Sequence, residues 1–322
     1  MKLDRRWLFW ILIALAAVPA CSKDYVTGKS SYNWFGLDQD IRLGKEVLNE
    51  QLTAFQKGEK YKGKTVEVDV DKEQLQRIQT VVDRIAKVSH LPNLPYEVHL
   101  AEIPVVNAWC APGGKIMVYS GLWDPKDGLI SKNNDAELAA VLAHEMAHAN
   151  ARHVTEMLST NMTIVLAGSV AQTAIGAAGS QMGSNLFGSF FSYGYNIFAP
   201  TYSRKSELEA DEIGLFYMAK AGYDPQVALE VWERASKKKG DITTIYASHP
   251  GSGERAKALQ QYLPLAEDIY HDPSLPYPNF AHMKKSLPKV QKGSEPQTHP
   301  SQSETQPSAP APVIHTSPKT DL

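Results

Sequence analysis

Residues Asp135–Asn150 read DAELAAVLAHEMAHAN, a run of strong helix formers that contains the pattern H-E-x-x-H. His144 and His148 are four residues apart, so on a helix they share a face and can hold one metal ion, with Glu145 beside them. Most other residues of the stretch are apolar, which predicts a buried helix. A buried Glu between two histidines needs partners or a metal ion to offset its desolvation.

A catalytic zinc site needs a third protein ligand. The arrangement H-E-x-x-H-x-x-G-x-x-H would need a histidine where the chain has Val154, and His153 is one position off that face, which indicates a helix-surface histidine. Glu156 lies too far along the same helix to close a site. No other carboxylate occurs before Glu207, so the third ligand is expected on a later helix.

That later helix is predicted to begin near Tyr202. Glu207 and Asp211 are four residues apart and share a face, whereas Glu209 points elsewhere. Glu207 would bind the ion, and Asp211 would accept the ring N–H of a ligating histidine and so fix its tautomer. The alternative is a solvated acidic face of a surface helix. The apolar remainder of the helix favours the ligand interpretation.

The rest of the chain predicts an α+β fold that is mostly helical. Apolar residues recur every three to four positions in five further segments, which predicts helices at residues 37–56, 71–89, 202–221, 224–239 and 254–263, the last of the chain. Alternating or apolar segments predict the strands of a small β-sheet beside the H-E-x-x-H helix, at residues 96–100, 105–110 and 115–119. The turn Pro112-Gly113-Gly114 lets the last two strands fold back on each other.

Several motifs in this order resemble one known family. His144-Glu145-x-x-His148 with Ser203-Arg204-x-x-Glu207-x-x-Ala210-Asp211 resembles the metallopeptidase family of CAAX prenyl endopeptidases and HtpX-like proteases, in its periplasmic lipoprotein branch. Asn107-Ala108-Trp109 resembles the family's substrate-side strand, and Ser248-His249-Pro250 with Arg255 resembles its His-Pro motif and following Arg. The resemblance spans about residues 91–263 and implies a zincin-like metallopeptidase domain.

The resemblance implies one zinc ion held by His144, His148 and Glu207. Zinc would activate a water molecule, and Glu145 is placed to take the water proton and pass it to the leaving amine. His249 and Arg255 are the candidates for stabilising the oxyanion, although Arg255 is equally suited to be a structural cation. The same resemblance implies a resting state in which His249 sits on the zinc ion. Asn107, Ala108 and Trp109 would bind an extended peptide by edge pairing.

The first twenty residues are typical of a bacterial export signal. A basic start precedes an apolar run over residues 7–18, which is too short to span a bilayer. Val18-Pro19-Ala20-Cys21 resembles a lipobox with Cys21 as the lipidated first residue; an ordinary secretory signal or an uncleaved anchor is the alternative. Ser22 follows in place of Asp, which by resemblance to lipoproteins of didermal bacteria implies the outer membrane, facing the periplasm.

Composition divides the chain into four segments. These are a signal peptide at 1–20, a lipidated tether at 21–36, a zinc metallopeptidase domain at 37–275, and a disordered tail rich in Pro, Ser, Gln and Thr at 276–322. Residues 161–200 contain no charged residue and no His, which favours a lid-like helical hairpin, or a segment that dips into a membrane. The formal net charge of −2 argues against nucleic acid as a partner. Cys110 is expected to be a small buried residue.

Together these features predict a zinc-dependent endopeptidase of the bacterial cell envelope, anchored through the lipid on Cys21. Its expected substrates are unfolded, misfolded or mis-assembled envelope proteins. The alternative is a chaperone-like assembly factor for outer-membrane proteins that uses the same cleft to bind clients. The complete set of zinc ligands and base favours the enzyme, because a pure binder has no need of Glu145.

Overall fold

The computed structural model describes residues 21–58, 60–61, 63–174, 202–238, 244–245, 249 and 252–280. The expected signal peptide therefore lies outside the described residues, as do most of the uncharged segment at 161–200 and the chain beyond residue 280.

Helices make up most of the described chain and are α2 (Leu37–Gln56), α3 (Lys72–Val88), α4 (Asp135–Asn150), α5 (His153–Ala174), α8 (Arg204–Lys220), α9 (Gln226–Ser236), α11 (Ser252–Gln260) and α12 (Leu263–His271). The helix predicted at 37–56 is confirmed to the residue. The H-E-x-x-H helix was expected to extend through His153 to Leu158, but α4 ends at Asn150 and a separate helix, α5, begins at His153. The helix predicted as the last of the chain is wrong in that respect, because α12 follows it. Pro264 sits in the first turn of α12, where its missing N–H is tolerated.

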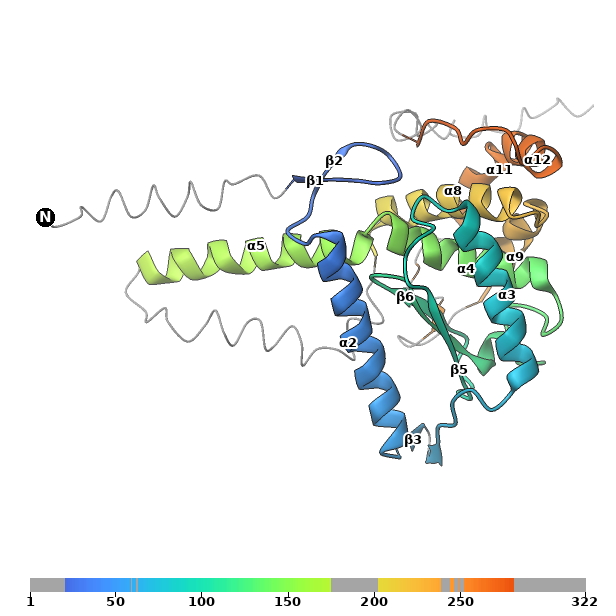
Figure 1. The fold of residues 1–322 in the computed structure, drawn as a ribbon, viewed down its shortest axis with the longest axis horizontal. Coiled ribbons are helices and arrows are strands. Elements are labelled where there is room, and N and C mark those ends of the chain that lie inside the picture. The colour runs from blue at the N-terminus through green and yellow to red at the C-terminus, as the bar shows by residue number, and fades with distance from the viewer. Residues whose placement is uncertain are drawn as a thin grey trace, which may run out of the picture. The chain divides into compact units, whose positions relative to one another are not determined.

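A small sheet lies beside α4 (Figure 1). Its strand order is β5 (Glu97–Ala101), β7 (Lys115–Tyr119), β6 (Ala108–Ala111), with β5 parallel and β6 antiparallel to β7. The β6–β7 turn places Gly113 and Gly114 at φ 73° and 81°, which a side chain would strain. A Cβ on Gly113 would also lie 2.4 Å from the Cα of Ile41 in α2. The predicted α+β fold, mostly helical with a small sheet, is confirmed.

The core is built around α4, which packs against α3, α8, α9 and β6. The approach of α8 to α4 is close because residue 214 is Gly: a Cβ there would lie 2.9 Å from the backbone nitrogen of His144. This contact brings the acidic face of α8 onto the histidine face of α4. Both faces are shielded from water, because residues 138–150 of α4 are buried throughout and Glu207 and Asp211 of α8 are buried as well.

The N-terminal segment expected as a tether is a folded hairpin in the structure. Its strands β1 (Cys21–Lys23) and β2 (Ser30–Tyr32) pair antiparallel, and the hairpin lies along the start of α5 (Figure 1). Ser31 Oγ donates to Glu156 Oε1 at 2.5 Å, and Asn33 Nδ2 donates to Thr155 Oγ1 at 2.9 Å. Buried polar side chains that find such partners hold the segment on the domain. A further pair of two-residue strands, β3 (Lys60–Tyr61) and β4 (Lys64–Thr65), follows α2.

The folded part also extends beyond residue 275, where the tail was expected to begin. The hydroxyl of Tyr277 donates to the carbonyl oxygen of Val88 at 2.6 Å, and Phe280 is 4% exposed. Both rings pack against His90. Burial of these two aromatic rings stabilises the segment as part of the folded domain, although its high Pro content had predicted disorder.

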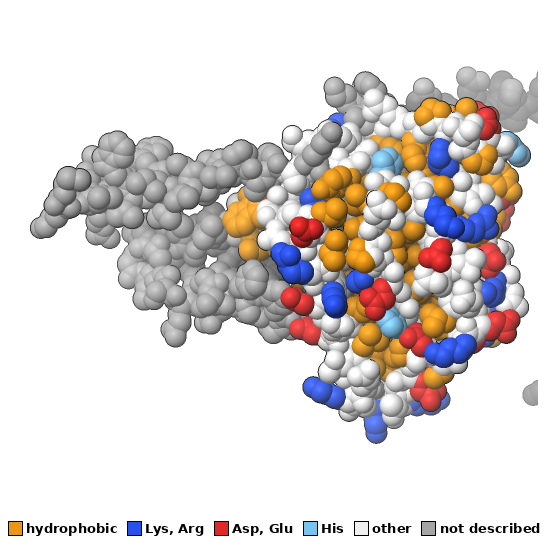
Figure 2. Space-filling model, viewed as in Figure 1, with side chains coloured by type: hydrophobic (Ala, Val, Ile, Leu, Met, Phe, Trp, Pro, Cys, Tyr) orange, Lys and Arg blue, Asp and Glu red, His pale blue; other side chains and the backbone are white. Residues whose placement is uncertain are grey.

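On the face of the described residues seen in Figure 2, acidic and basic side chains are interspersed around apolar ones. That face therefore carries no broad field of one sign. Among the described residues, none of the helices combines the length and the apolar character needed to cross a membrane.

Candidate metal centre

Helix α4 carries the two histidines into the protein interior. Asn134 caps its first turn by accepting from the backbone N–H groups of Ala136 and Glu137. His144 and His148 lie one turn apart, 1% and 0% exposed, with their Nε2 atoms 3.1 Å apart. Two imidazole nitrogens pointing at each other in a dry interior are the arrangement that a shared cation stabilises.

Helix α8 supplies a carboxylate to the same point. Ser203 caps this helix, and Glu207 lies in its first turn, fully buried. Glu207 Oε1 is 3.4 Å from His148 Nε2, and Glu207 Oε2 is 3.7 Å from His144 Nε2. The spacing of the two helices thus brings together the three side chains that the sequence pattern predicted as ligands.

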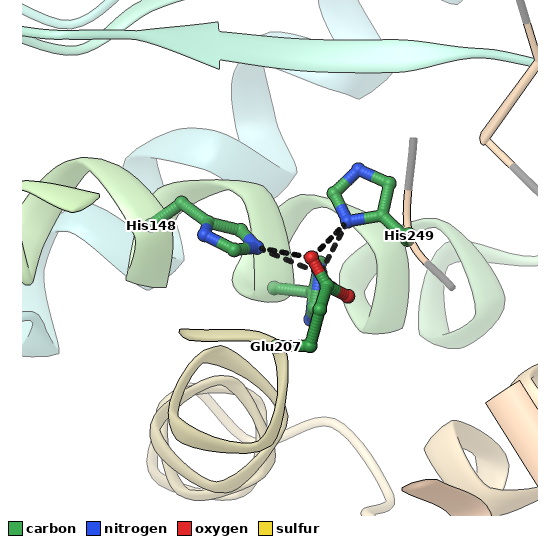
Figure 3. Close-up of side chains that lie close together, drawn as sticks. His148, Glu207 and His249 are labelled. Carbon is green, nitrogen blue, oxygen red and sulfur yellow. Dashed lines mark hydrogen bonds and ion pairs between the residues drawn. The ribbon is translucent and has the colours of Figure 1, made fainter. Parts of the chain in front are cut away.

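His249 completes the cluster from a loop. Figure 3 shows His148 of α4, Glu207 of α8 and His249 with their donor atoms turned toward one another. His249 Nδ1 lies 2.9 Å from Glu207 Oε1 and 3.1 Å from His144 Nε2. One donor atom from each of the four residues lies within 4.8 Å of all the others.

The donor set fits a zinc ion. Zinc bonds of about 2.0–2.2 Å in a tetrahedron place neighbouring donor atoms roughly 3.3 Å apart. With Oε1 as the Glu207 donor, the observed separations are 2.9, 3.1, 3.1 and 3.4 Å, and the second oxygen of Glu207 lies 3.7 Å from His144 Nε2. Burial lowers the pKa of His144 to about 4 and holds the pKa of His148 well below its usual value. Both imidazoles are therefore neutral near pH 7, with lone pairs available to a metal.

A buried charge network surrounds Glu207. Arg255, 1% exposed, reaches Asp211 with two N–O contacts of 2.6 Å and Glu207 Oε2 with one of 2.5 Å. Asp211 Oδ1 also lies 2.9 Å from His144 Nδ1. Burial alone would raise the pKa values of Glu207 and Asp211, but Arg255 and the nearby histidines hold both pKa values below their usual range. Both carboxylates are thus charged at neutral pH.

Glu145 contacts both the sheet and His249. Its carboxylate accepts from the backbone N–H of Cys110 in β6, and Oε1 lies 3.3 Å from His249 Nε2. Burial is the main reason that the pKa of Glu145 is raised to about 7. A carboxyl group with this pKa beside a metal cluster suits proton transfer at neutral pH.

Comparison with known proteins bears on this site directly. The sequence model of peptidase family M48 matches residues 72–263, which include every residue of the cluster. The chain belongs to peptidase family M48. The mitochondrial metalloendopeptidase OMA1 of Schizosaccharomyces pombe is 30% identical over 287 residues, which cover 84% of this chain and 77% of that protein. OMA1 of Arabidopsis thaliana is 39% identical over 177 residues, covering 55% of this chain and 33% of that one.

A bacterial relative is also similar: the metalloprotease LoiP of Escherichia coli is 27% identical over 189 residues, covering 58% of this chain and 70% of that protein. This chain thus spans about a third of its Arabidopsis relative but most of the other two. With this family membership and this donor set, the protein is a zinc metalloendopeptidase that takes one zinc ion.

Strand β6 of this M48 peptidase is an edge strand of the sheet and packs against α4. Cys110 directs its N–H to Glu145, while the carbonyl of Val106 accepts from the backbone N–H of Ile245 at 2.8 Å. Asn107 is 5% exposed, and its Oδ1 accepts from the N–H of Ala108 at 2.9 Å. Trp109 is also 5% exposed and packs on the opposite side of the sheet, in the core with Met117.

Three residues close to the cluster were not predicted as part of the site. Tyr202 stacks on the ring of His148, with centroids 3.8 Å apart and an interplanar angle of 19°. His153 lies 2.8 Å from His148 through the two Nδ1 atoms, and Glu209 faces His153. The prediction that His153 is a helix-surface residue is wrong, because it is 3% exposed. Arg152 adopts φ 59°, which ends α4 and turns His153 back toward the cluster.

Proposed function

We propose that this zinc metalloendopeptidase acts in the bacterial cell envelope on misfolded or mis-assembled proteins. The chemistry rests on one observation: His144, His148 and Glu207 converge in a buried cluster with Glu145 beside it. We assign the three converging residues as the zinc ligands. The compartment rests on the lipobox-like sequence before Cys21 and on the apolar run that precedes it.

Glu145 is the proposed general base. When bound, zinc acts as a Lewis acid that polarises the scissile carbonyl and activates water. Glu145 takes the proton from water and later gives it to the leaving amine, a task that its pKa of about 7 suits. The N–H of Cys110 and the ring of His249 hold its carboxylate in place.

His249 and Arg255 take different proposed roles. His249 is the mobile donor: in the described arrangement it contacts Glu207 and Glu145, where substrate has to enter, and it stabilises the oxyanion after it has moved aside. Arg255 is a positioning residue, because its guanidinium already binds Asp211, Glu207 and the carbonyl oxygen of His249. Those contacts leave it directed at the ligands and not at a substrate.

The outer edge of β6 is the proposed substrate site. An extended peptide that pairs with Ala108 and its neighbours would run past Glu145 and so bring a backbone carbonyl to the cluster. Main-chain pairing tolerates many side chains, which suits unfolded protein segments as substrates. Asn107 Oδ1 accepts from the N–H of Ala108 and would release this N–H when a peptide pairs with the edge, while Trp109 anchors the strand from the core side.

The proposed organisation of the precursor follows from the same sequence features. A signal peptide at 1–20 is removed, and Cys21 receives the lipid that anchors the enzyme in the outer membrane, facing the periplasm. The hairpin that starts at Cys21 is then the first part of the catalytic domain, and the residues after Phe280 are rich in Pro, Ser, Gln and Thr. Fractionation of wild type and Cys21→Ala tests the anchor: the variant is expected to move from the membrane to the soluble fraction.

The decisive experiment compares wild type with Glu145→Gln on an unfolded protein substrate. We expect cleavage to fall by a factor of about 10²–10⁴ in the variant, and to stop when a chelator removes zinc from wild type. Glu254→Gln is the matched control, because Glu254 is an exposed carboxylate paired with Arg204. Undiminished cleavage by Glu145→Gln would refute the assignment. Full rescue of envelope integrity by Glu145→Gln in a deletion strain would instead support the chaperone-like alternative.

A further inference from the structure

The outward nitrogen of each ligating histidine needs a partner that fixes the ring. Metal-bound histidines in proteins donate their second N–H to a carboxylate, a carbonyl or water, and this contact sets the tautomer and the ring plane. For His144 the partner is Asp211, 2.9 Å from Nδ1. For His148 the atom in that place is Nδ1 of His153, at 2.8 Å. An imidazole partner is the unusual feature of the second side.

The tautomers of these two rings are fixed by the contact. His148 turns Nε2 to the cluster, so Nε2 carries the lone pair and Nδ1 carries the hydrogen. His153 then accepts at its own Nδ1, which leaves its hydrogen on Nε2. That nitrogen faces Glu209 Oε2 at 3.6 Å. The donation therefore runs from His148 to His153, and the Glu209 carboxylate lies near the far nitrogen of His153 at a distance longer than a hydrogen bond.

The surroundings hold His153 in this orientation. The ring is 3% exposed, and Tyr202 lies against both His148 and His153, at centroid distances of 3.8 and 6.4 Å. The preceding residue, Arg152, is fixed by two contacts with buried Asp40, at 2.6 and 3.1 Å. These contacts secure the turn that carries His153 back toward α4.

We propose that His153, oriented by Glu209, is a positioning residue that holds zinc ligand His148 in its metal-binding tautomer and ring plane. The inference rests on the proposed function, because it takes His148 as a ligand. His153 is not itself a ligand: its accepting nitrogen is directed at His148, and it is absent from the group of donor atoms that converge within 4.8 Å.

The test measures zinc affinity by competition with a chromophoric chelator, using the full chain without its signal segment. His153→Phe keeps a ring but removes the acceptor, and zinc binding is expected to weaken by about 10–100-fold. His153→Asn places Oδ1 where Nδ1 was, so it should recover most of that affinity. Glu209→Gln should weaken binding less than His153→Phe, by about threefold or more. His90→Phe is the control, since His90 contacts Tyr217 outside the cluster.

The outcomes separate this inference from the proposed function. If wild type binds no zinc, the proposed ligand set fails. If wild type binds zinc and folded His153→Phe binds it equally well, only the positioning role is overturned. Equal weakening in the Phe and Asn variants also overturns it, because a structural role does not depend on the acceptor. Should His153→Phe not fold, Glu209→Gln decides: weaker zinc binding supports the role, and unchanged affinity overturns it.

Discussion

The two histidines of α4 lie one turn apart and face the same cluster, yet different chemistry holds them. On the His144 side, Asp211 is part of a buried charge network with Arg255. On the His148 side, the partner is the imidazole ring of His153, which a turn in the backbone brings close. The charged side is strong and costly to disturb, since removal of one partner leaves a buried charge. On the His148 side, the position of His153 depends on the contacts that hold the turn at Arg152.

The largest effect is expected on the charged side. Asp211→Asn removes the carboxylate that two Arg255 contacts and one His144 contact share. The free energy of unfolding should fall by about 3–5 kcal/mol, because Arg255 keeps its charge in the interior. Zinc affinity should fall by about 10–100-fold. Urea unfolding and chelator competition check both values, with His153→Asn as the comparison; equal losses of stability in the two variants would remove the distinction between the sides.

The turn at Arg152, on the His148 side, is expected to make the stability of a variant depend on pH. Arg152→Met leaves Asp40 buried without its guanidinium and should lower the free energy of unfolding by about 3 kcal/mol at pH 7. Burial already raises the pKa of Asp40 above 3.8 in spite of Arg152, and loss of the arginine raises this pKa further.

The sign of the pH effect follows from that shift. In Arg152→Met the pKa of Asp40 is higher in the folded than in the unfolded state, so the folded state binds this proton more tightly. Protonation of Asp40 therefore raises the free energy of unfolding of the variant as the pH falls from 7 toward about 4. The difference in the free energy of unfolding between wild type and Arg152→Met should therefore become smaller as the pH is lowered from 7 to 5. Asp40→Asn/Arg152→Met, which has no carboxylate to titrate, should show no such narrowing. A deficit in Arg152→Met that is constant with pH would contradict this account.

Separation of the two helices should weaken both sides at once. In Gly214→Ala the new Cβ would lie 2.9 Å from the backbone nitrogen of His144, which forces α8 away from α4. Overpacking of this kind costs about 1–3 kcal/mol and exceeds the gain of about 1 kcal/mol in helix propensity. A lower melting temperature and severalfold weaker zinc binding are expected. Gly36→Ala, whose Cβ would meet only Gln39 Oε1 at 3.7 Å, should leave zinc affinity unchanged.

The smallest effect is expected from the ring that covers His148. Tyr202→Leu removes a stacked pair worth about 0.5–1.5 kcal/mol, so zinc affinity should fall by roughly two- to tenfold. Tyr202→Phe keeps the stack and should bind zinc like wild type. Equal affinity in the Leu and wild-type proteins would show that His153 alone is enough to hold the ring.

The same contrast explains what the sequence could predict. Glu207 and Asp211 were found because they lie four apart on one helix, and periodicity within a helix is visible in sequence. His153 was misjudged because α4 was expected to continue through it. Gly or Asn at position 152 would have indicated that the helix ends there, because these residues commonly adopt positive φ, whereas Arg152 gives no such signal in the sequence. The hairpin at 21–32 was missed for a related reason: its polar residues read as a loop, and their partners on α5 lie more than a hundred residues away.

If Cys21 is acylated as proposed, the hairpin also limits how far the enzyme reaches from the membrane. Arg152, the neighbour of His153, donates to Ser22 Oγ at 3.0 Å, so the residue after Cys21 is fastened to the turn beside the metal cluster. If Cys21 carries the proposed lipid, no flexible linker separates the lipid from the domain. The active site would then work at a fixed height above the bilayer and would cut only chains that come to that height, such as segments left exposed near the membrane surface.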